Sequence, residues 1–559
     1  MRRNIVVSVA CLLLILHVGA TTVSAQGKWV EGFLQRYRPT AVTFPPNAGV
    51  SQQELADMIR SGQLPLTVND MINLLLSNNL DVGLNRLSPL SSEYILTSLY
   101  RTFEPTLRLG ATVGRSTTPS TNQFSSESNI QLSHGYSVGF GQTLQTGTRV
   151  AVDFSMNRLS TNSPFATFDP SWSDNIRYSF VQPLMRDRGK LINTRQIRIA
   201  KNNQDISEIQ FEQNVINLVV QAQKTYWDLV FAAEDIKVKQ RSVDLAQKTL
   251  SDNQIQVNVG TMAPIDLIQA QSEVASRKEA LVVTTYTQTQ NEDQVKKLIT
   301  SQSDPGMVLA RLTPMQAARR PVAGDVPAIE EGIRIALENR PEMRQLELEL
   351  KNKDIDVEYT KNQLLPVVDL SASYTQNGIG GIKNVRAGFG APITEKIPGG
   401  QWDAMKQMFG YDYTGYQIGI NVQIPLRNSA AQADNARAVT DKRIVENRLT
   451  STAQQIALEV RNASTQVEMN RARIEAAQTA RELAERRLES EQKKYDLGAS
   501  TIRFVLEEQR NVAQAQTNEI AALVNYTKAL VDFDRATGMS LKKNNIQIEK
   551  TLGLPGAAK

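Results

Sequence analysis

Two long stretches of the sequence contain neither glycine nor proline, and they constrain the fold more than any other feature. The first runs from Lys190 to Val259, and the second from Leu426 to Leu497. The second is dense in Ala, Glu, Arg, Gln and Leu, which are good helix formers. At ~1.5 Å per residue, each stretch predicts a helix roughly 100 Å long, which does not fit an ordinary globular domain.

Each long helix is followed by a turn and a shorter helix that returns along it. The first turn contains Gly260 and Pro264, and the second contains Gly498. Proline suits the first position of a helix, where its missing N–H is not needed. A solitary antiparallel coiled coil would explain one such hairpin but not two. The expected helices are long helices over about 190–259 and 430–497, and return helices over 264–298 and 501–536.

Landmarks of one unit recur in the same order in the second half of the chain, which indicates a tandem duplication. The offsets between copies are 261 at Asn78 and Asn339, 261 at Pro105 and Pro366, 242 at Pro183 and Pro425, and 238 at Gly260 and Gly498. The offset falls mainly within the region between the prolines, from 261 to 242, so the first copy is longer there.

Between the long helices, apolar residues recur with a period of two, which predicts strands with one apolar and one polar face. In the clearest strand, apolar Tyr416, Ile418, Ile420 and Val422 alternate with Gln417, Gly419, Asn421 and Gln423. A half-buried sheet in a soluble domain would show the same period. The few strands lie between very long helices, and this context favours a transmembrane barrel in which Ile420 and Val422 face lipid while Asn421 and Gln423 face the lumen.

The number of strands has a consequence for assembly. Two principal strands in each repeat, within about 105–183 and 366–425, give four in the chain. Four strands cannot close a barrel, which needs about eight. The open edges of the sheet must then pair with other copies of the chain, so the sequence predicts an oligomer.

The N-terminus predicts export. Arg2 and Arg3 precede an apolar run, and small residues up to Ala25 offer a cleavage point, as in a signal peptide. The only cysteine, Cys11, lies inside the apolar run; lipid modification there is an alternative, but the run continues beyond it. No later run reaches the ~18 apolar residues of a membrane helix. Without Arg2 and Arg3, 60 basic residues (62 − 2) stand against 57 acidic ones, and this net charge of +3 indicates no nucleic-acid partner.

Residues typical of catalytic sites are sparse. His134 is the only histidine beyond the signal peptide, and no His, Cys or paired carboxylate motif lies near it, so a surface or loop histidine is favoured over a metal ligand. The glycines Gly378, Gly380 and Gly381 are similar to a phosphate loop, but they open no predicted helix. The sequence therefore predicts no catalytic, cofactor-binding or metal site, no cofactor and no enzyme.

The doubled order of helix, strand pair, proline exit, glycine-free long helix, turn and returning helix resembles the TolC family of outer-membrane efflux and secretion channels. The likeness covers nearly all of residues 65–538 and is most specific at the turns from Val259 to Gln271 and from Tyr495 to Ile502. It implies a mainly α fold with a membrane β-barrel, in which a homotrimer forms 12 strands (3 × 4) that continue into a long periplasmic α-helical barrel. The longer first strand region departs from the simplest family pattern.

The resemblance also implies a function. Such a protein is the outer-membrane duct of a tripartite efflux or type I secretion system in a Gram-negative-type cell, and it passively conducts small molecules or polypeptides. Its partners are a periplasmic adaptor, an inner-membrane transporter and outer-membrane lipid. Two alternatives are a periplasmic adaptor, which has only one hairpin, and a structural or adhesive trimeric coiled coil, which lacks strand pairs of this kind.

Family roles fall on the hairpin tips. The adaptor-docking positions are Gly260, Thr261, Gly498, Ala499 and Ser500. Asp266 and Tyr495 match positions that pair in a latch at the entrance, and Glu507 matches an acidic constriction. Phe504 stands where the family often has another carboxylate, and Ser500 where an arginine strengthens the latch. A structural reading stays open, in which Asp266 favours the helix dipole and Tyr495 packs at a helix end.

The expected organisation divides the chain into six segments. They are a signal peptide (1–25), a lead-in of unassigned role (26–66), a first repeat (67–300), an equatorial linker (301–326), a second repeat (327–538) and an equatorial tail (539–559).

Overall fold

The computed structural model describes residues 37–39, 59, 62–119, 128–260, 262–300, 305–322, 324–388 and 391–547. The expected signal peptide, with Cys11, lies outside these residues, as does most of the lead-in. The chain divides into Met1–Ala48 and Gly49–Lys559, and every helix and strand described belongs to the second unit.

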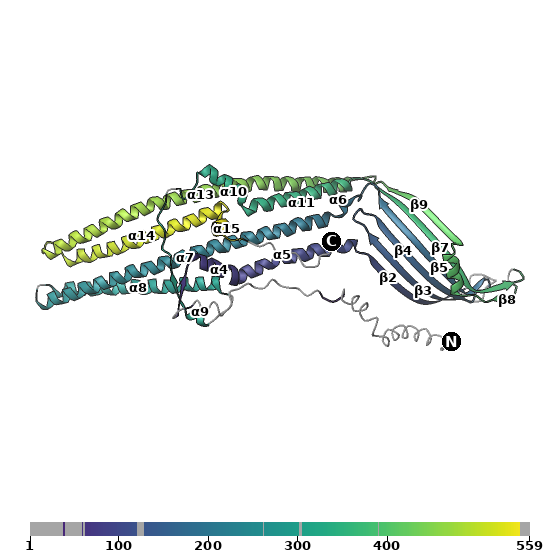
Figure 1. Cartoon of the computed structure of the whole chain (residues 1–559), viewed down its shortest axis with the longest axis horizontal. Coiled ribbons are helices and arrows are strands. Elements are labelled where there is room, and N and C mark those ends of the chain that lie inside the picture. Colours follow the sequence, from purple (N-terminus) through teal and green to yellow (C-terminus); the bar gives the residue numbers. More distant parts are fainter. Residues whose placement is uncertain are drawn as a thin grey trace. The chain divides into compact units, whose positions relative to one another are not determined.

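Two helical hairpins form from the stretches without glycine and proline (Figure 1). The first joins α7 (Arg195–Asn258) to α8 (Pro264–Ile299), and the one-turn helix α6 (Lys190–Asn193) precedes it. The second joins α13 (Ser429–Asp496) to α14 (Ile502–Ala536). With 64 residues in α7 and 68 in α13, both long helices measure roughly 100 Å, as the sequence predicts.

Shorter helices precede each strand region. They are α4 (Val68–Asn78), α5 (Leu80–Leu99) and the 3-10 turn η1 (Tyr100–Phe103) in the first repeat, and α10 (Ile329–Asn339) and α11 (Pro341–Gln363) in the second. One extended residue breaks the helix in each repeat: Asn79 has φ −68° and ψ 129°, and Arg340 has φ −68° and ψ 130°. These two residues are 261 positions apart (340 − 79), which is the offset seen in the sequence and supports the duplication.

Apolar side chains at helical spacing join the helices. In the first repeat, Val219, Tyr226 and Leu229 of α7 are buried against Leu75 of α4 and Ile299 of α8. The second cluster joins α10, α13 and α14 through Ala336, Val460, Tyr526 and Phe533. Burying an aliphatic side chain of this size contributes about 1.5–3 kcal/mol, so packing between the helices supplies much of their stability.

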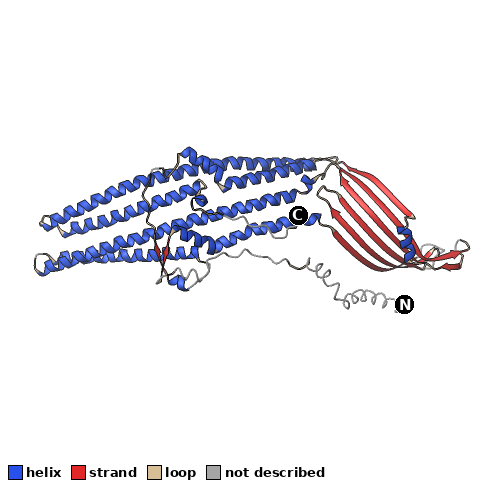
Figure 2. Cartoon of the chain, in the orientation of Figure 1, coloured by secondary structure: helices blue, strands red, loops and turns tan. Residues whose placement is uncertain are grey.

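The long strands form one antiparallel sheet in the order β2-β3-β4-β5-β7-β9, and the short β8 also pairs with β7 (Figure 2). The strands are β2 (Thr106–Pro119), β3 (Ser128–Thr143), β4 (Arg149–Thr161), β5 (Phe168–Pro183), β7 (Val367–Arg386), β8 (Ile393–Ile397) and β9 (Tyr413–Gln423). The expectation of two principal strands in each repeat is wrong for the first repeat, which has four, because β3 and β4 form a further hairpin. The count of four strands per chain is therefore wrong too: the described chain has six long strands.

The sheet has one apolar and one polar face across all six long strands. One row of paired residues on the apolar face contains Leu107, Phe140, Val152, Tyr178, Tyr374 and Tyr416. The adjacent row on the polar face contains Arg108, Gly139, Asp153, Arg177, Thr375 and Gly415. Because successive strand residues point to opposite faces, Ile420 and Val422 lie on the apolar face and Asn421 and Gln423 on the polar one.

A short helix, α12 (Gln401–Phe409), packs against β5 and β7, where glycine leaves room for its backbone. A Cβ on Gly378 would lie 1.9 Å from the Ala404 carbonyl oxygen, and one on Gly380 would lie 2.2 Å from that of Gly400. Both separations are far inside van der Waals contact, so any larger residue would displace α12. The glycines that are similar to a phosphate loop thus have a packing role on the apolar face of the sheet.

A second, small sheet pairs β1 (Gln63–Leu66) with β6 (Arg311–Pro314) in parallel. The Tyr226 hydroxyl donates to the Leu66 carbonyl at 3.0 Å and accepts from the Gln316 N–H at 3.2 Å, so it ties both segments to α7. The adjoining segments form α9 (Pro305–Leu309) and, after α14, α15 (Ser540–Lys543). The end of the lead-in, whose role the sequence leaves open, therefore packs with the linker.

Candidate functional site

Each hairpin tip turns at a glycine in the left-handed region, with φ 78° at Gly260 and 70° at Gly498. At the second tip, the Ala499 N–H donates to the Lys494 carbonyl at 2.8 Å and the Gly498 N–H donates to that of Tyr495 at 2.9 Å. This pair of bonds is the Schellman ending of a helix, which favours glycine because a Cβ is strained at positive φ. Among the described residues, a Cβ at either glycine would have no neighbour within 4 Å, so both turns face open space. Thr261 lies outside the described residues.

The two tips pack against each other through a small apolar cluster. Ala270 of α8 is buried with Ile502, Val505 and Leu506 of α14. Leu250, Met262, Leu488 and Tyr495 surround this group. The cluster contains residues from both hairpins, so movement of one tip relative to the other would expose apolar surface.

The hydrogen bond expected between Tyr495 and Asp266 is wrong for this structure. The Tyr495 hydroxyl has one proton, which it donates to Gln256 Oε1 on α7 at 3.0 Å. Burial raises the pKa of Tyr495 above its ordinary value, and the nearby charge of Asp266 acts in the same direction. Tyr495 therefore still joins the two hairpins, but Gln256 takes the place that the resemblance gave to Asp266. Asp266 lies in the first turn of α8.

Arg277 of α8 makes the densest polar contacts at the tips, and no motif in the sequence marks it. Its side chain is 7% exposed. It donates to Glu273 at 3.0 Å on its own helix and to the Ser242 carbonyl at 3.0 Å on α7. It also donates to Gln509 at 3.2 Å and to the Leu506 carbonyl at 3.1 Å on α14. Arg277 thus holds α14 to the first hairpin; in the sequence, its spacing from Glu273 is that of an ordinary surface ion pair.

The remaining predicted residues are Phe504 and Glu507, on α14, and Ser500, in the turn before α14. Phe504 and Glu507 are exposed on α14, three positions apart and so on one face, opposite the buried Val505 and Leu506. The Ser500 hydroxyl donates to Glu491, and this bond, together with the Lys494 ammonium 3.0 Å away, lowers the pKa of Glu491. Ser500 therefore bonds within its own hairpin, whereas the resemblance gives this position an arginine that strengthens the latch.

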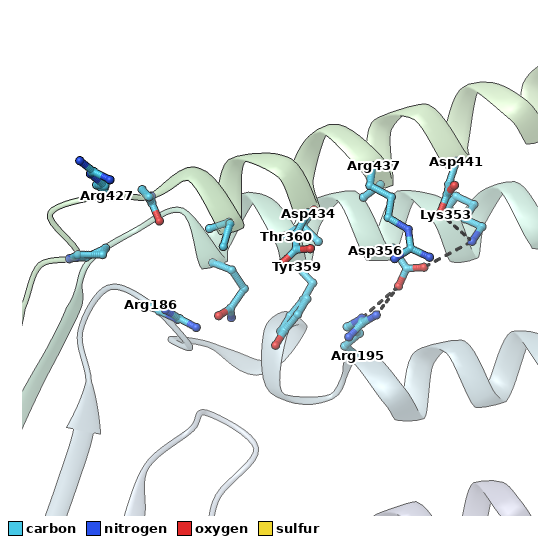
Figure 3. Close-up of a pocket in the computed structure, with 16 residues that line it drawn as sticks. Arg186, Arg195, Lys353, Asp356, Tyr359, Thr360, Arg427, Asp434, Arg437 and Asp441 are labelled. Carbon is cyan, nitrogen blue, oxygen red and sulfur yellow. Dashed lines mark hydrogen bonds and ion pairs between the residues drawn. The ribbon is translucent and has the colours of Figure 1, made fainter.

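A cavity of about 640 Å³ lies near the starts of α7 and α13, beside α11 (Figure 3). Arg195 donates to Asp356 at 2.8 Å, and its guanidinium carbon lies 4.3 Å from the centroid of the Tyr359 ring. Lys353 lies 4.0 Å from both Asp356 and Asp441. These contacts join α7 to α11 and α11 to α13. The charged side chains that line the cavity therefore hold together the start of α7, the end of α11 and the start of α13.

The sequence matches the outer membrane efflux protein family over residues 71–301 and 332–539. These two segments together make up well over half of the chain. The chain belongs to the outer membrane efflux protein family. This membership places it in the outer membrane, with its helices extending into the periplasm, and the family is one of channel-forming proteins and not of enzymes.

Solved structures share the fold of this outer membrane efflux protein. The CmeC outer membrane channel of Campylobacter jejuni has a TM-score of 0.59 at 15% identity, covering 91% of this chain and 98% of CmeC. A membrane protein from Pseudomonas aeruginosa has a TM-score of 0.60 at 15% identity, covering 90% and 98%. The outer membrane protein VceC from Vibrio cholerae has 0.58 at 13%, covering 84% and 96%. At these identities the likeness shows the fold alone. No curated protein sequence matches the chain.

In this outer membrane efflux protein His134 lies in strand β3, paired with Val113 and Arg158, and not in a loop. Among the described residues, no group of three or more His, Cys, Asp and Glu side chains is placed to hold a metal ion. None of the described helices combines the length and apolar character needed to cross a membrane.

Proposed function

We propose that three copies of this chain form a channel through the outer membrane and the periplasm. The channel passively conducts small molecules or polypeptides from an inner-membrane transporter, which reaches it through a periplasmic adaptor. The two repeats, 67–300 and 327–538, supply the walls of the channel, and the linker and tail, 301–326 and 539–559, form a band around the helices.

One observation carries this proposal: the sheet has an apolar and a polar face along its whole width, and its edge strands, β2 and β9, each pair on one side only among the described residues. An apolar outer face with a polar inner face is the pattern of a membrane barrel. In lipid every backbone polar group needs a partner, so the two edges require neighbouring copies. The helical hairpins supply the periplasmic part, because α7 and α13 lead directly away from β5 and β9.

The exposure of the tips supports adaptor docking there. Gly260 and Gly498 lie at the turns of the hairpins, and a Cβ at either position would have no described neighbour within 4 Å, so the backbone there is accessible to a partner. Replacing both glycines with Trp should abolish export while leaving trimers intact, since neither side chain would meet another described part of this chain. Replacing both with Ala brings the same strain at positive φ without the bulk, and this control should still export. Normal export by the double Trp variant would show that the adaptor docks elsewhere on the chain.

The assembly itself is tested by fractionation and mass. Heat-modifiable migration in outer-membrane fractions and a trimer mass in native mass spectrometry support the channel. A stable monomer with a closed barrel would contradict it. A soluble periplasmic protein would favour the adaptor alternative, and an outer-membrane trimer with no conductance in planar bilayers would favour the structural one. A pull-down from solubilised envelopes then identifies the transporter that co-purifies.

A further inference from the structure

The additional β3–β4 hairpin of the first repeat changes what the proposed trimer can build. We infer that each chain contributes six strands to the barrel, so that three chains close an 18-stranded barrel (3 × 6) in which β9 of one chain pairs with β2 of the next. This inference rests on the proposed trimeric channel and concerns the width of its outer-membrane part.

All six strands are long enough to cross a membrane. They contain 14, 16, 13, 16, 20 and 11 residues in the order β2, β3, β4, β5, β7 and β9. A tilted transmembrane strand needs about 9–11 residues. The seventh strand, β8, has 5 and is too short. The hairpin therefore adds two full crossings and not a surface flap.

The hairpin is also built into the sheet. β3 and β4 pair from Gln131 and Thr161 down to Thr143 and Arg149, and β4 pairs in turn with β5. Their turn is fixed to the start of the helices, where the Gly189 N–H donates to the Thr146 carbonyl at 3.1 Å. The hairpin continues both faces of the sheet, since Phe140 and Val152 extend the apolar row while Gly139 and Asp153 extend the polar one. Strands facing the lumen on one side and lipid on the other are barrel strands.

The strand directions allow closure. Neighbouring strands alternate in direction across the sheet, so with an even number the two edges, β2 and β9, run in opposite directions. The edges of adjacent copies can therefore pair antiparallel, like the rest of the sheet. Side chains at the edges are more open than those within the apolar face: Leu109 is 74% and Ile418 is 72% exposed, whereas Val138 on an inner strand is 40% exposed.

With six strands, the sheet and the helices of one chain have similar widths. Strands ~4.8 Å apart and tilted about 40° from the barrel axis occupy about 38 Å of circumference for six strands and about 25 Å for four. Each chain supplies four helices side by side to the wall, α5, α7, α11 and α13 on the side of the sheet. At 8–10 Å between axes they occupy about 32–40 Å. Six strands thus continue the helical wall without a constriction.

The consequence is a wide exit. For three copies, six strands per chain give a backbone radius of about 18 Å, against about 12 Å for four strands at the same tilt. The cross-section is then about twofold larger. The outer-membrane part of this channel therefore suits polypeptides or bulky molecules, and the entrance at the hairpin tips becomes the narrow part of the path.

Electron cryomicroscopy of the full-length protein in lipid nanodiscs tests the inference directly. We expect 18 strands around three chains. Three chains with 12 barrel strands and the β3–β4 hairpin outside the wall would overturn the inference while leaving the trimeric channel intact. Two chains with 12 strands would instead contradict the trimer and the 18-stranded barrel while keeping six strands per chain.

Cysteine cross-linking tests the seam between copies. Leu109→Cys on β2 is combined in turn with cysteine at Tyr416, Ile418, Ile420 or Val422 on β9. We expect at least one pair to give covalent trimers, whereas Val138→Cys on an inner strand with the same partners should give none. Cys11, the only cysteine of the sequence, lies in the expected signal peptide, so the mature chain has no native cysteine that could form other cross-links. Absence of cross-links at all four positions would overturn the β9–β2 seam.

Deletion of the hairpin tests its role in the width. Removing residues 128–161 joins β2 to β5 at the same end of the sheet and keeps their opposite directions. The variant should form trimers with 12 strands (3 × 4) and a cross-section about half as large. An unchanged barrel diameter in the variant would show that the hairpin does not belong to the wall.

Discussion

The two strand regions of this chain differ far more than the two helical hairpins that follow them. The first repeat contributes four long strands to the sheet, β2 to β5. The second repeat contributes two, β7 and β9, and has β8 and α12 between them. The hairpins keep their lengths, with 64 and 36 residues in α7 and α8 against 68 and 35 in α13 and α14. A hairpin can enter a sheet with every new backbone group paired and the strand directions kept. A change of length in one long helix would shift every later contact with its neighbours.

The largest effect is expected from substitutions on the two edge strands, β2 and β9. They test whether the two edges are equivalent although they belong to different repeats. Leu109→Arg on β2 and Ile420→Arg on β9 should both prevent trimers from accumulating, because an arginine facing the middle of the bilayer costs about 2–4 kcal/mol per chain. Asn421→Arg, on the polar face, is the matched control and should assemble normally in heat-modifiability assays. Equal losses at positions 420 and 421 would contradict the assigned faces.

A second prediction concerns an asymmetry between the hairpins. Arg277 of the first hairpin donates hydrogen bonds to Gln509 and Leu506 of α14. Its counterpart 238 positions later (277 + 238) is Ala515, so the second hairpin has no charged donor at that position. Arg277→Met should lower the free energy of unfolding by about 1.5–3 kcal/mol, since hydrogen bonds from a charged donor are lost. Hydrogen exchange should quicken near Leu506. Lys278→Met, on the adjacent exposed residue, should change neither quantity.

The third prediction tests α12, which among the described residues belongs to the second strand region alone. Gly378→Leu should displace α12 from β7, at a cost of about 1–3 kcal/mol, because the backbone of Ala404 occupies the space of the new side chain. Faster protease cleavage within 401–409 would report the displacement. Gly415→Leu on β9 is the control, since a Cβ there has no described neighbour within 4 Å. Equal cleavage in both variants would mean that the glycines do not seat the helix.

The smallest effect is expected at the contact between the tips. Tyr495→Phe removes the hydrogen bond to Gln256, which is worth about 0.5–1.5 kcal/mol, and should raise single-channel conductance in planar bilayers if the tips close the entrance. Gln256→Ala should have the same effect and add little to it. A larger response to Asp266→Ala than to Gln256→Ala would restore the latch expected from the resemblance. In the same recordings Glu507→Gln should weaken cation selectivity.

The pattern of residues along the chain determined much of this protein. Long stretches without glycine and proline specify the helices, because nothing within them interrupts the backbone hydrogen bonds. Alternating polarity specifies the strands and their faces, and recurring landmarks such as Asn78 and Asn339 revealed the duplication. These are local properties, which each segment carries in its own residues.

Tertiary structure alone decided the number of strands and the partners at the tips. The first strand region, Thr106–Pro183, is only moderately longer than the second, Val367–Gln423. This modest difference in length hides a gain of two strands, because the second region uses its remaining length for β8 and α12. Tyr495 reaches Gln256 and Arg277 reaches Leu506 only because the two hairpins pack at one particular rotation. That rotation is set by apolar surface buried between segments far apart in the sequence, and no single segment encodes it.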